Sequence, residues 1–319
     1  MKCKTLTHLN MKKILIVIGL VICLAGAAFL FFTTGRQTAN SNDSERAYME
    51  LVIEGKDIEG TVNVLQKRLE SYGVKDLRTE SLEQNVLTIS FLPQDSMQCI
   101  RKLLCTKGRL EFLTTYTGGE LYSSFIKAEE VISEKSGEDL SSPLFDILNY
   151  EYSTYARIGL VNVKDTAKIA EYLRMPEVKE IIGKDFIPAW SKYPEFGTED
   201  TFALIGIRRP RENEKVLDSD EVEKAVIEYY DGAAEIRIKM TKKGGRIFRR
   251  LTGDNLGRQI AVTIDGLVYI YPFVHERIDG GECSIVCKEM TESELKTTAA
   301  MLNGGMLPAT VMITREWIE

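Results

Sequence analysis

Few side chains in this sequence stand in a spacing that supports catalysis. The chain contains two histidines, His8 and His275, and neither has a cysteine or serine motif around it. The sequence has no G-x-S-x-G, H-E-x-x-H or phosphate-binding loop, the patterns that place a nucleophile, a metal or a nucleotide. Its many carboxylates follow no spacing that pairs them for acid–base work. We therefore expect no catalytic residue, no cofactor and no enzymatic activity, with His275 at the surface.

The six cysteines form neither a metal pattern nor a disulfide pattern. Cys99 and Cys105 fall in one predicted helix, and Cys283 and Cys287 fall in one predicted strand. Four residues along a strand span about 13 Å, which exceeds the reach of a disulfide. No C-x-x-C pair suggests zinc, so we expect no metal site. The cysteines are expected to act as small buried hydrophobic residues.

The sequence supports binding better than catalysis. The evidence for binding is the set of aromatic residues after residue 268. Tyr269, Tyr271 and Phe273 lie beside a strand that ends in a proline. Aromatic side chains next to an open strand edge suit extended peptides, which gain main-chain hydrogen bonds and apolar pockets. Alternatively, these rings fill a core. Tyr269 and Tyr271 are expected to share a face with Ile260, which favours burial, whereas Phe273 is freer to be exposed.

A β-hairpin positions these rings. Asp265-Gly266 is a strong hairpin signal, because a type I′ turn needs positive φ at both central residues. Both faces of the two strands are largely apolar, so the hairpin should lie in a sheet covered on at least one side. Pairing around the turn predicts that one face carries Ile260, Val262, Ile264, Leu267, Tyr269 and Tyr271.

A glycine turn and a capped helix follow the hairpin. Gly280-Gly281 predicts the turn. Thr291 and Glu294 form a capping box for a helix, and Gly304-Gly305 ends that helix.

The upstream segments suggest two further units. Residues 47–115 follow the βαββαβ order of a ferredoxin-like unit, with 109–115 as its last strand. Residues 116–215 form a looser insert, with helices expected near 121–132 and 165–174 and a strand at 201–207. Within 216–319, we expect a helix over 218–229, a strand over 234–240 and a helix over 244–251.

Residues 14–32 are uncharged and mostly apolar, and four lysines but no acidic residue precede them. Their length approaches the roughly 20 residues that span a bilayer. The positive-inside rule then places the N-terminus in the cytoplasm and the body outside. We expect a retained anchor within residues 1–34, followed by a linker at 35–46. A cleaved signal peptide, lipidation at Cys23 and a start at Met11 remain alternatives.

The formal net charge of −6 makes nucleic acid an unexpected partner. Short basic runs occur at 208–209, 242–243 and 249–250. We expect them to be dispersed on solvated faces rather than to form a phosphate site.

The C-terminal third carries a resemblance to a known family. The runs LTGDNLGRQIAVTIDGLVY (251–269), IDGG (278–281) and MLNGGMLPA (301–309) resemble, in order and spacing, the first large periplasmic domain of SecD, an accessory subunit of protein export. Residues 64–74 and 108–112 are similar to its opening helix and a following strand. The insert resembles the one in fused SecDF proteins of Bacteroidetes-type bacteria.

The resemblance implies an α+β fold with a ferredoxin-like base and an α/β head, preceded by one transmembrane helix. It implies a single-pass inner-membrane location with a periplasmic body. Its partners would be the SecYEG channel or SecDF-type proteins, together with unfolded exported polypeptides. Because the sequence ends at Glu319, we expect the proton-driven membrane part of the family to be missing. The alternatives are an envelope structural module without an export role and an envelope enzyme with an unrecognised site.

Overall fold

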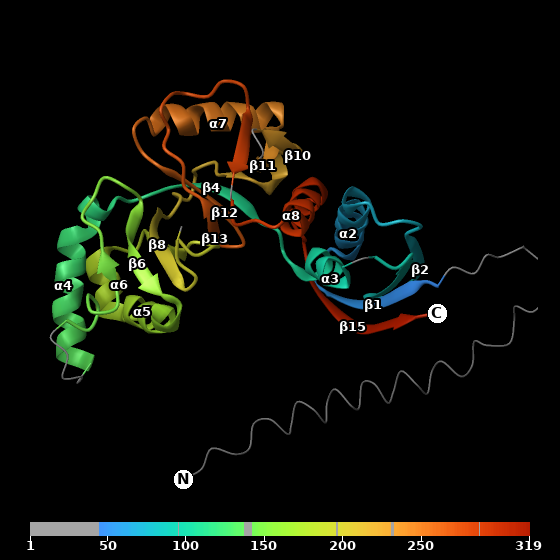
Figure 1. Cartoon of the computed structure of the whole chain (residues 1–319), viewed down its shortest axis with the longest axis horizontal. Coiled ribbons are helices and arrows are strands. Elements are labelled where there is room, and N and C mark those ends of the chain that lie inside the picture. Colours follow the sequence, from blue (N-terminus) through green and yellow to red (C-terminus); the bar gives the residue numbers. More distant parts are fainter. Residues whose placement is uncertain (1–44, 95, 137–141, 196, 231–232, 287) are drawn as a thin grey trace, which may run out of the picture. The chain divides into compact units, whose positions relative to one another are not determined.

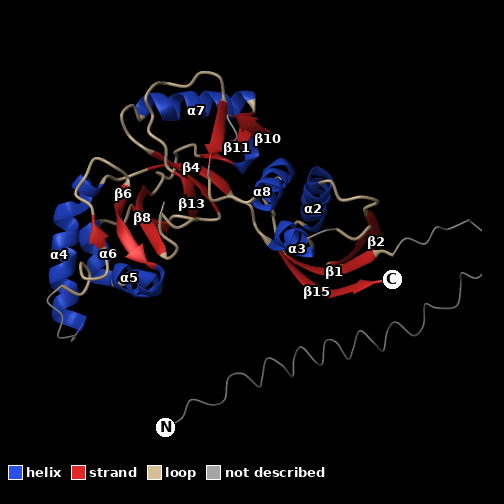
Figure 2. Ribbon diagram, viewed as in Figure 1, coloured by secondary structure: helices blue, strands red, loops and turns tan. Residues whose placement is uncertain are grey.

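The computed structural model describes residues 45–319 except 95, 137–141, 196, 231–232 and 287. Pairings between its strands are antiparallel and form four sheets, with helices packed against them (Figures 1 and 2). The chain therefore has a mixed α+β fold, as expected. The predicted membrane segment at 14–32 lies outside the described residues. Within the described part, every helix is too short or too polar to traverse a bilayer.

The base sheet joins strands from both ends of the described chain. The elements of this layer are β1 (Ala47–Glu54), α2 (Ile58–Tyr72), β2 (Arg78–Glu83), β3 (Val86–Phe91), α3 (Met97–Cys105) and β15 (Thr310–Ile318). The strand order is β15-β1-β3-β2. Alternate residues of β1 are buried, so one face of the sheet packs against the helices.

The expected last strand of the base does not belong to this sheet. Strand β4 (Leu110–Thr114) pairs with β12 and β9, and β15 occupies the place beside β1. The assignment of 109–115 to the base sheet was therefore wrong. A strand that follows a helix can pair with any open edge, and here the partner of β1 comes from residues more than 250 positions later in the chain.

The central sheet has the order β13-β12-β4-β9. Its further strands are β9 (Leu217–Asp218), β12 (Ile260–Ile264) and β13 (Leu267–Ile270). All five residues of β12 are buried. One face contributes Phe112, Ile260 and Val262 to the largest core cluster, and the other contributes Leu113 and Ala261 to a smaller cluster shared with the insert. Both faces are thus covered, which explains why both are apolar.

A three-stranded sheet of order β10-β11-β14 lies next to helices α7 and α8 (Figure 2). Its layer comprises β10 (Val222–Tyr230), β11 (Ala233–Met240), α7 (Lys242–Asp254), β14 (Glu282–Val286) and α8 (Glu292–Gly304). The helix expected over 218–229 is wrong: after a 3₁₀ turn at Ser219–Glu221, this segment is strand β10. Its β-branched and tyrosine residues suit a strand, and β11 offers a partner along its whole length.

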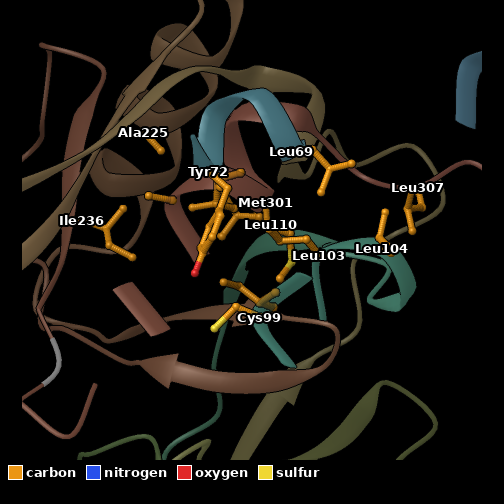
Figure 3. Packing of buried hydrophobic residues seen from close by; sticks show 14 of the residues in the cluster. Leu69, Tyr72, Cys99, Leu103, Leu104, Leu110, Ala225, Ile236, Met301 and Leu307 are labelled. Atoms are coloured by element: carbon orange, nitrogen blue, oxygen red, sulfur yellow. The ribbon is translucent and has the colours of Figure 1, made fainter. Parts of the chain in front are cut away.

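Helix α8 connects the base with the three-stranded sheet. The expected capping box is present, with Thr291 Oγ1 accepting from the Glu294 amide at 3.2 Å. The helix contacts α2, α3 and β10, and one continuous hydrophobic cluster runs through all of them. Figure 3 shows Tyr72 and Met301 between Ala225 and Ile236 on one side and Leu103 on the other. The base and the sheets beyond α8 therefore share a core.

The insert has a sheet of order β5-β6-β8-β7 and its own hydrophobic cluster. Its elements are α4 (Gly118–Ser136), β5 (Asn149–Tyr150), β6 (Arg157–Asn162), a 3₁₀ turn (Val163–Asp165), α5 (Thr166–Arg174), α6 (Pro176–Ile182), β7 (Phe186–Trp190) and β8 (Thr201–Arg208). The helices cover one face of this sheet. The other face uses small residues such as Ala189 and Ala203 to pack on the central sheet.

Candidate functional site

The β12–β13 hairpin turn lies where the chain passes from the base into the central sheet. Asp265 and Gly266 have φ of 51° and 80°, as a type I′ turn requires. The carboxylate of Asp265 accepts hydrogen bonds from the amides of Gly108 (2.9 Å) and Arg109 (2.8 Å). The turn residue therefore also fixes the backbone between α3 and β4.

A β-bulge separates the aromatic residues after the turn. Thr263 pairs with Val268, but Val262 pairs with Ile270. Tyr269 is therefore an extra residue, and the faces of the strand are exchanged beyond it. The expectation that Tyr271 shares a face with Ile260 and Val262 is wrong. Tyr271 packs instead with the cluster that joins the central sheet to the insert.

Tyr271 belongs to a hydrogen-bond network with the insert. Its hydroxyl donates to Glu195 at 3.0 Å, and Arg157 donates to Glu195 at 2.9 Å and to Glu151 at 2.9 Å. Burial raises the pKa of the Tyr271 hydroxyl, with a smaller contribution from Glu195. Gln259 Nε2 donates to the Tyr271 carbonyl at 2.7 Å. These contacts hold two sheets together and place Tyr271 away from a free surface.

Tyr269 is half-buried, and its ring meets Tyr193 edge-on with centroids 6.0 Å apart. Tyr269, Tyr271 and Phe273 were expected to act together, but their rings pack in three different environments.

Phe273 lies at an apolar cavity of about 350 Å³. The walls come from the central sheet, α7, the 272–278 loop and β14, and they comprise Phe112, Phe248, Thr252, Ile260, Val262, Ile270, Pro272, Phe273, Val274, His275, Glu276, Ile278, Cys283, Ser284 and Ile285. The Phe273 ring stacks on His275 at 6.0 Å and meets Tyr155 of the insert edge-on at 5.4 Å. Sequence reasoning named Phe273 and the proline before it but could not assemble the other walls.

The walls of this cavity carry few polar groups. Burial raises the pKa of Cys283 to about 12, so its thiol stays protonated at neutral pH. Ser284 Oγ donates to Glu235 at 2.9 Å, away from any histidine. In the described part of the chain, no group of three histidine, cysteine or acidic residues is arranged to hold a metal ion. An apolar cavity with a few polar groups at its rim accepts apolar side chains.

Strand β14 gives this cavity a second feature. It is the last strand of its sheet, so one side of its backbone lies outside the β10-β11-β14 ladder. Gly281, at its start, has φ of 66° and approaches helix α7 so closely that an added Cβ would lie 3.0 Å from the Gly245 Cα. Gly280 has no such neighbour within 4 Å.

The remaining turn glycines lie at the return to the base. A Cβ on Gly304 would lie 2.3 Å from Arg68 Cγ, and Gly305 has φ of 89°. Helix α8 can thus approach α2 closely just before it ends.

The fold and this cavity define a multi-sheet α+β domain with an apolar cavity beside the edge strand β14. Residues 207–309 match the family model for the SecDF P1 head subdomain. The SecD protein translocase subunit of Rhodothermus marinus is 25% identical over 310 residues, covering 87% of this chain and 49% of that protein. The SecD subunit of Calditerrivibrio nitroreducens is 38% identical over 78 residues, covering 24% of this chain and 15% of that protein.

A solved structure of SecDF in its super-membrane-facing form covers 97% of this chain and 35% of its own, with a TM-score of 0.53 and 16% identity. That likeness shows a shared fold. The chain is therefore SecD-like and contains a SecDF P1 head subdomain. It spans about half the length of the Rhodothermus relative.

Proposed function

We propose that this chain contacts polypeptides during Sec-dependent protein export and that the cavity at Phe273 is the contact site. The cavity is the observation that carries the proposal, because it is large enough for apolar side chains and lies beside the edge strand β14. An extended segment could pair with β14 and place alternate side chains in the cavity. The likeness to SecD proteins supports the export context.

The same proposal assigns the cellular setting. The SecYEG channel or a SecDF-type protein is the partner, residues 14–32 are a single membrane anchor, and the body is periplasmic. Within that body, the layer of β1, β2, β3, β15 and two helices acts as a ferredoxin-like base. Co-purification of the full chain with SecYEG tests the partner, and absence of the channel from a gently solubilised preparation argues against it.

The contact site is tested by crosslinking. A photoreactive phenylalanine analogue replaces Phe273 in one variant and the exposed Tyr229 of β10, which does not line the cavity, in a control. We expect crosslinks to an unfolded exported polypeptide from position 273 and few from position 229. Phe273→Ala should weaken binding with little change in melting temperature. If Phe273→Ala lowers the melting temperature and leaves binding unchanged, the ring is part of the core and the site is elsewhere.

A further inference from the structure

Each of the three short basic runs of the sequence contributes at least one residue to one groove. Arg208 ends strand β8 of the insert and Arg209 follows it, whereas Lys243 and Arg250 lie on helix α7. All of them line a single groove of about 960 Å³. The runs were expected to be dispersed on solvated faces. Lys243 and Arg250 are exposed, as expected, but they are not dispersed, because the β8–β9 connection folds back towards α7 and brings residues 208–209 to the same groove.

The groove carries a surplus of positive charge within an acidic chain. Seven basic and three acidic side chains line it, whereas the formal net charge of the whole chain is −6. Arginine is the most frequent of these residues, and its planar guanidinium binds carboxylates through paired hydrogen bonds.

Several of these cations have no acidic partner in the part of the chain that the structure describes. Lys243 is paired with Glu221, Arg208 with Glu120, and Arg250 with Asp254. By contrast, Arg246 and Arg211 are exposed and in no ion pair among the described residues.

The loop that carries Arg211 has a defined shape. Glu214 Oε2 accepts from the Arg211 amide at 3.0 Å, and the Glu214 amide donates to the Arg211 carbonyl at 2.9 Å. The carboxylate of Glu214 therefore holds the loop backbone. Arg209 Nε donates to the Lys184 carbonyl at 3.2 Å, which fixes that side chain beside the groove without neutralising it.

The shape and the lining favour a polypeptide over a flat or densely charged ligand. Ile247 and Leu251 of α7 are half-buried and add apolar surface to the groove. Asp185 and Asp254 are acidic and would repel a continuous row of phosphates. A concave surface also excludes a planar lipid headgroup layer. Alternating apolar and cationic contacts match an extended segment that alternates acidic and uncharged residues.

We propose that this groove binds an acidic segment of a partner polypeptide through Arg211 and Arg246. The groove and the Phe273 cavity lie on different faces of α7, since the cavity takes Phe248 and Thr252 of that helix and the two share no lining residue. The inference therefore does not depend on the proposed role of the cavity.

The test uses the full chain and a fluorescein-labelled decapeptide of alternating glutamate and serine, with a glutamine–serine peptide as the uncharged counterpart. Fluorescence anisotropy measures binding at low and at raised salt. The double variant R211Q/R246Q should weaken binding of the glutamate peptide roughly tenfold. The matched control K224Q/K242Q removes two exposed basic charges, one of them on α7, that neither line the groove nor form an ion pair among the described residues, and it should change binding less than about twofold.

Three results would overturn the proposal. The first is equal binding of the two peptides, and the second is equal weakening by the two double variants, which would indicate a response to net charge. The third is sedimentation with vesicles of anionic phospholipid without binding of the glutamate peptide, which would assign the groove to a membrane. Because Phe273 lies outside the groove, Phe273→Ala should leave the glutamate peptide bound, so failure of the cavity proposal is separable from failure of this one.

Discussion

Arg68 donates to the Gly305 carbonyl through both Nε (3.0 Å) and Nη2 (2.6 Å), joining helix α2 to the end of helix α8. The same guanidinium donates to the carbonyls of Leu103, Thr106 and Lys107. It is fully buried, and burial lowers its pKa to about 10, against a smaller opposing effect of Asp265. One side chain therefore fixes both backbone segments that connect the base with the rest of the molecule.

Removing this contact should be costly. Arg68→Met keeps most of the side-chain volume but removes the guanidinium donors from four carbonyl groups, of which only that of Lys107 retains another donor among the described residues, the Leu307 amide at 2.9 Å. We expect a loss of roughly 3–5 kcal/mol in the free energy of unfolding, measured by urea denaturation. Exposed Arg78 of β2 provides the control, and Arg78→Met should change stability by less than about 1 kcal/mol. Equal effects of the two changes would contradict a bridging role for Arg68.

The two glycines before β14 differ in what their backbones require. Gly281→Ala should destabilise the chain by about 1–3 kcal/mol, because φ is positive there and the new Cβ would crowd Gly245. Gly280→Ala should be close to neutral, since an added methyl group meets nothing within 4 Å. Thermal unfolding of both variants is the measurement, and a neutral Gly281→Ala would show that α7 and β14 can separate without cost.

A buried acid gives the fold a defined response to pH. The side chains of Lys243 and Thr241 donate to Glu221 and lower the pKa of its carboxyl in the folded state. A folded-state pKa below the unfolded value adds stability above about pH 4.5, and this stability is lost as the pH falls through the folded-state pKa. The difference in unfolding free energy between the parent chain and Glu221→Gln should therefore shrink below that pH. A difference independent of pH between 3 and 7 would contradict this linkage.

The hydroxyl of Tyr271 should matter for stability and not for the Phe273 cavity. Tyr271→Phe removes the bond to Glu195, and we expect a loss of about 1 kcal/mol because Arg157 still pairs with that carboxylate. Crosslinking from position 273 should be unchanged, since Tyr271 lies on the other face of the sheet. A loss of crosslinking without a loss of stability would return Tyr271 to the binding site.

Local signals predicted local structure well. The positive φ at Asp265 and Gly266 and the capping box of α8 depend on neighbouring residues, and such patterns are readable in a sequence. The pairing of β1 with β15 cannot be read from the sequence, because nothing near either strand specifies a partner more than two hundred residues away.

The site was harder to predict for a related reason. One extra residue at Tyr269 reverses the faces of the strand beyond it, and no residue type marks that bulge. The prediction of a helix over 218–229 was wrong because this segment pairs with strand β11 along its length. The basic groove depends on where the 209–216 loop returns, which is a tertiary property.

The pairing of β1 with β15 has a mechanical consequence. Arg46 and Glu319 exchange backbone hydrogen bonds, with N···O distances of 2.6 and 2.9 Å. The start of β1 and the end of β15 therefore lie at the same end of their ladder. A load applied across these two residues would open the ladder one bond at a time from that end instead of shearing all bonds together. The base sheet would thus open progressively at low force. Helix α8 and the sheets beyond it would bear the load only after β15 had separated from β1.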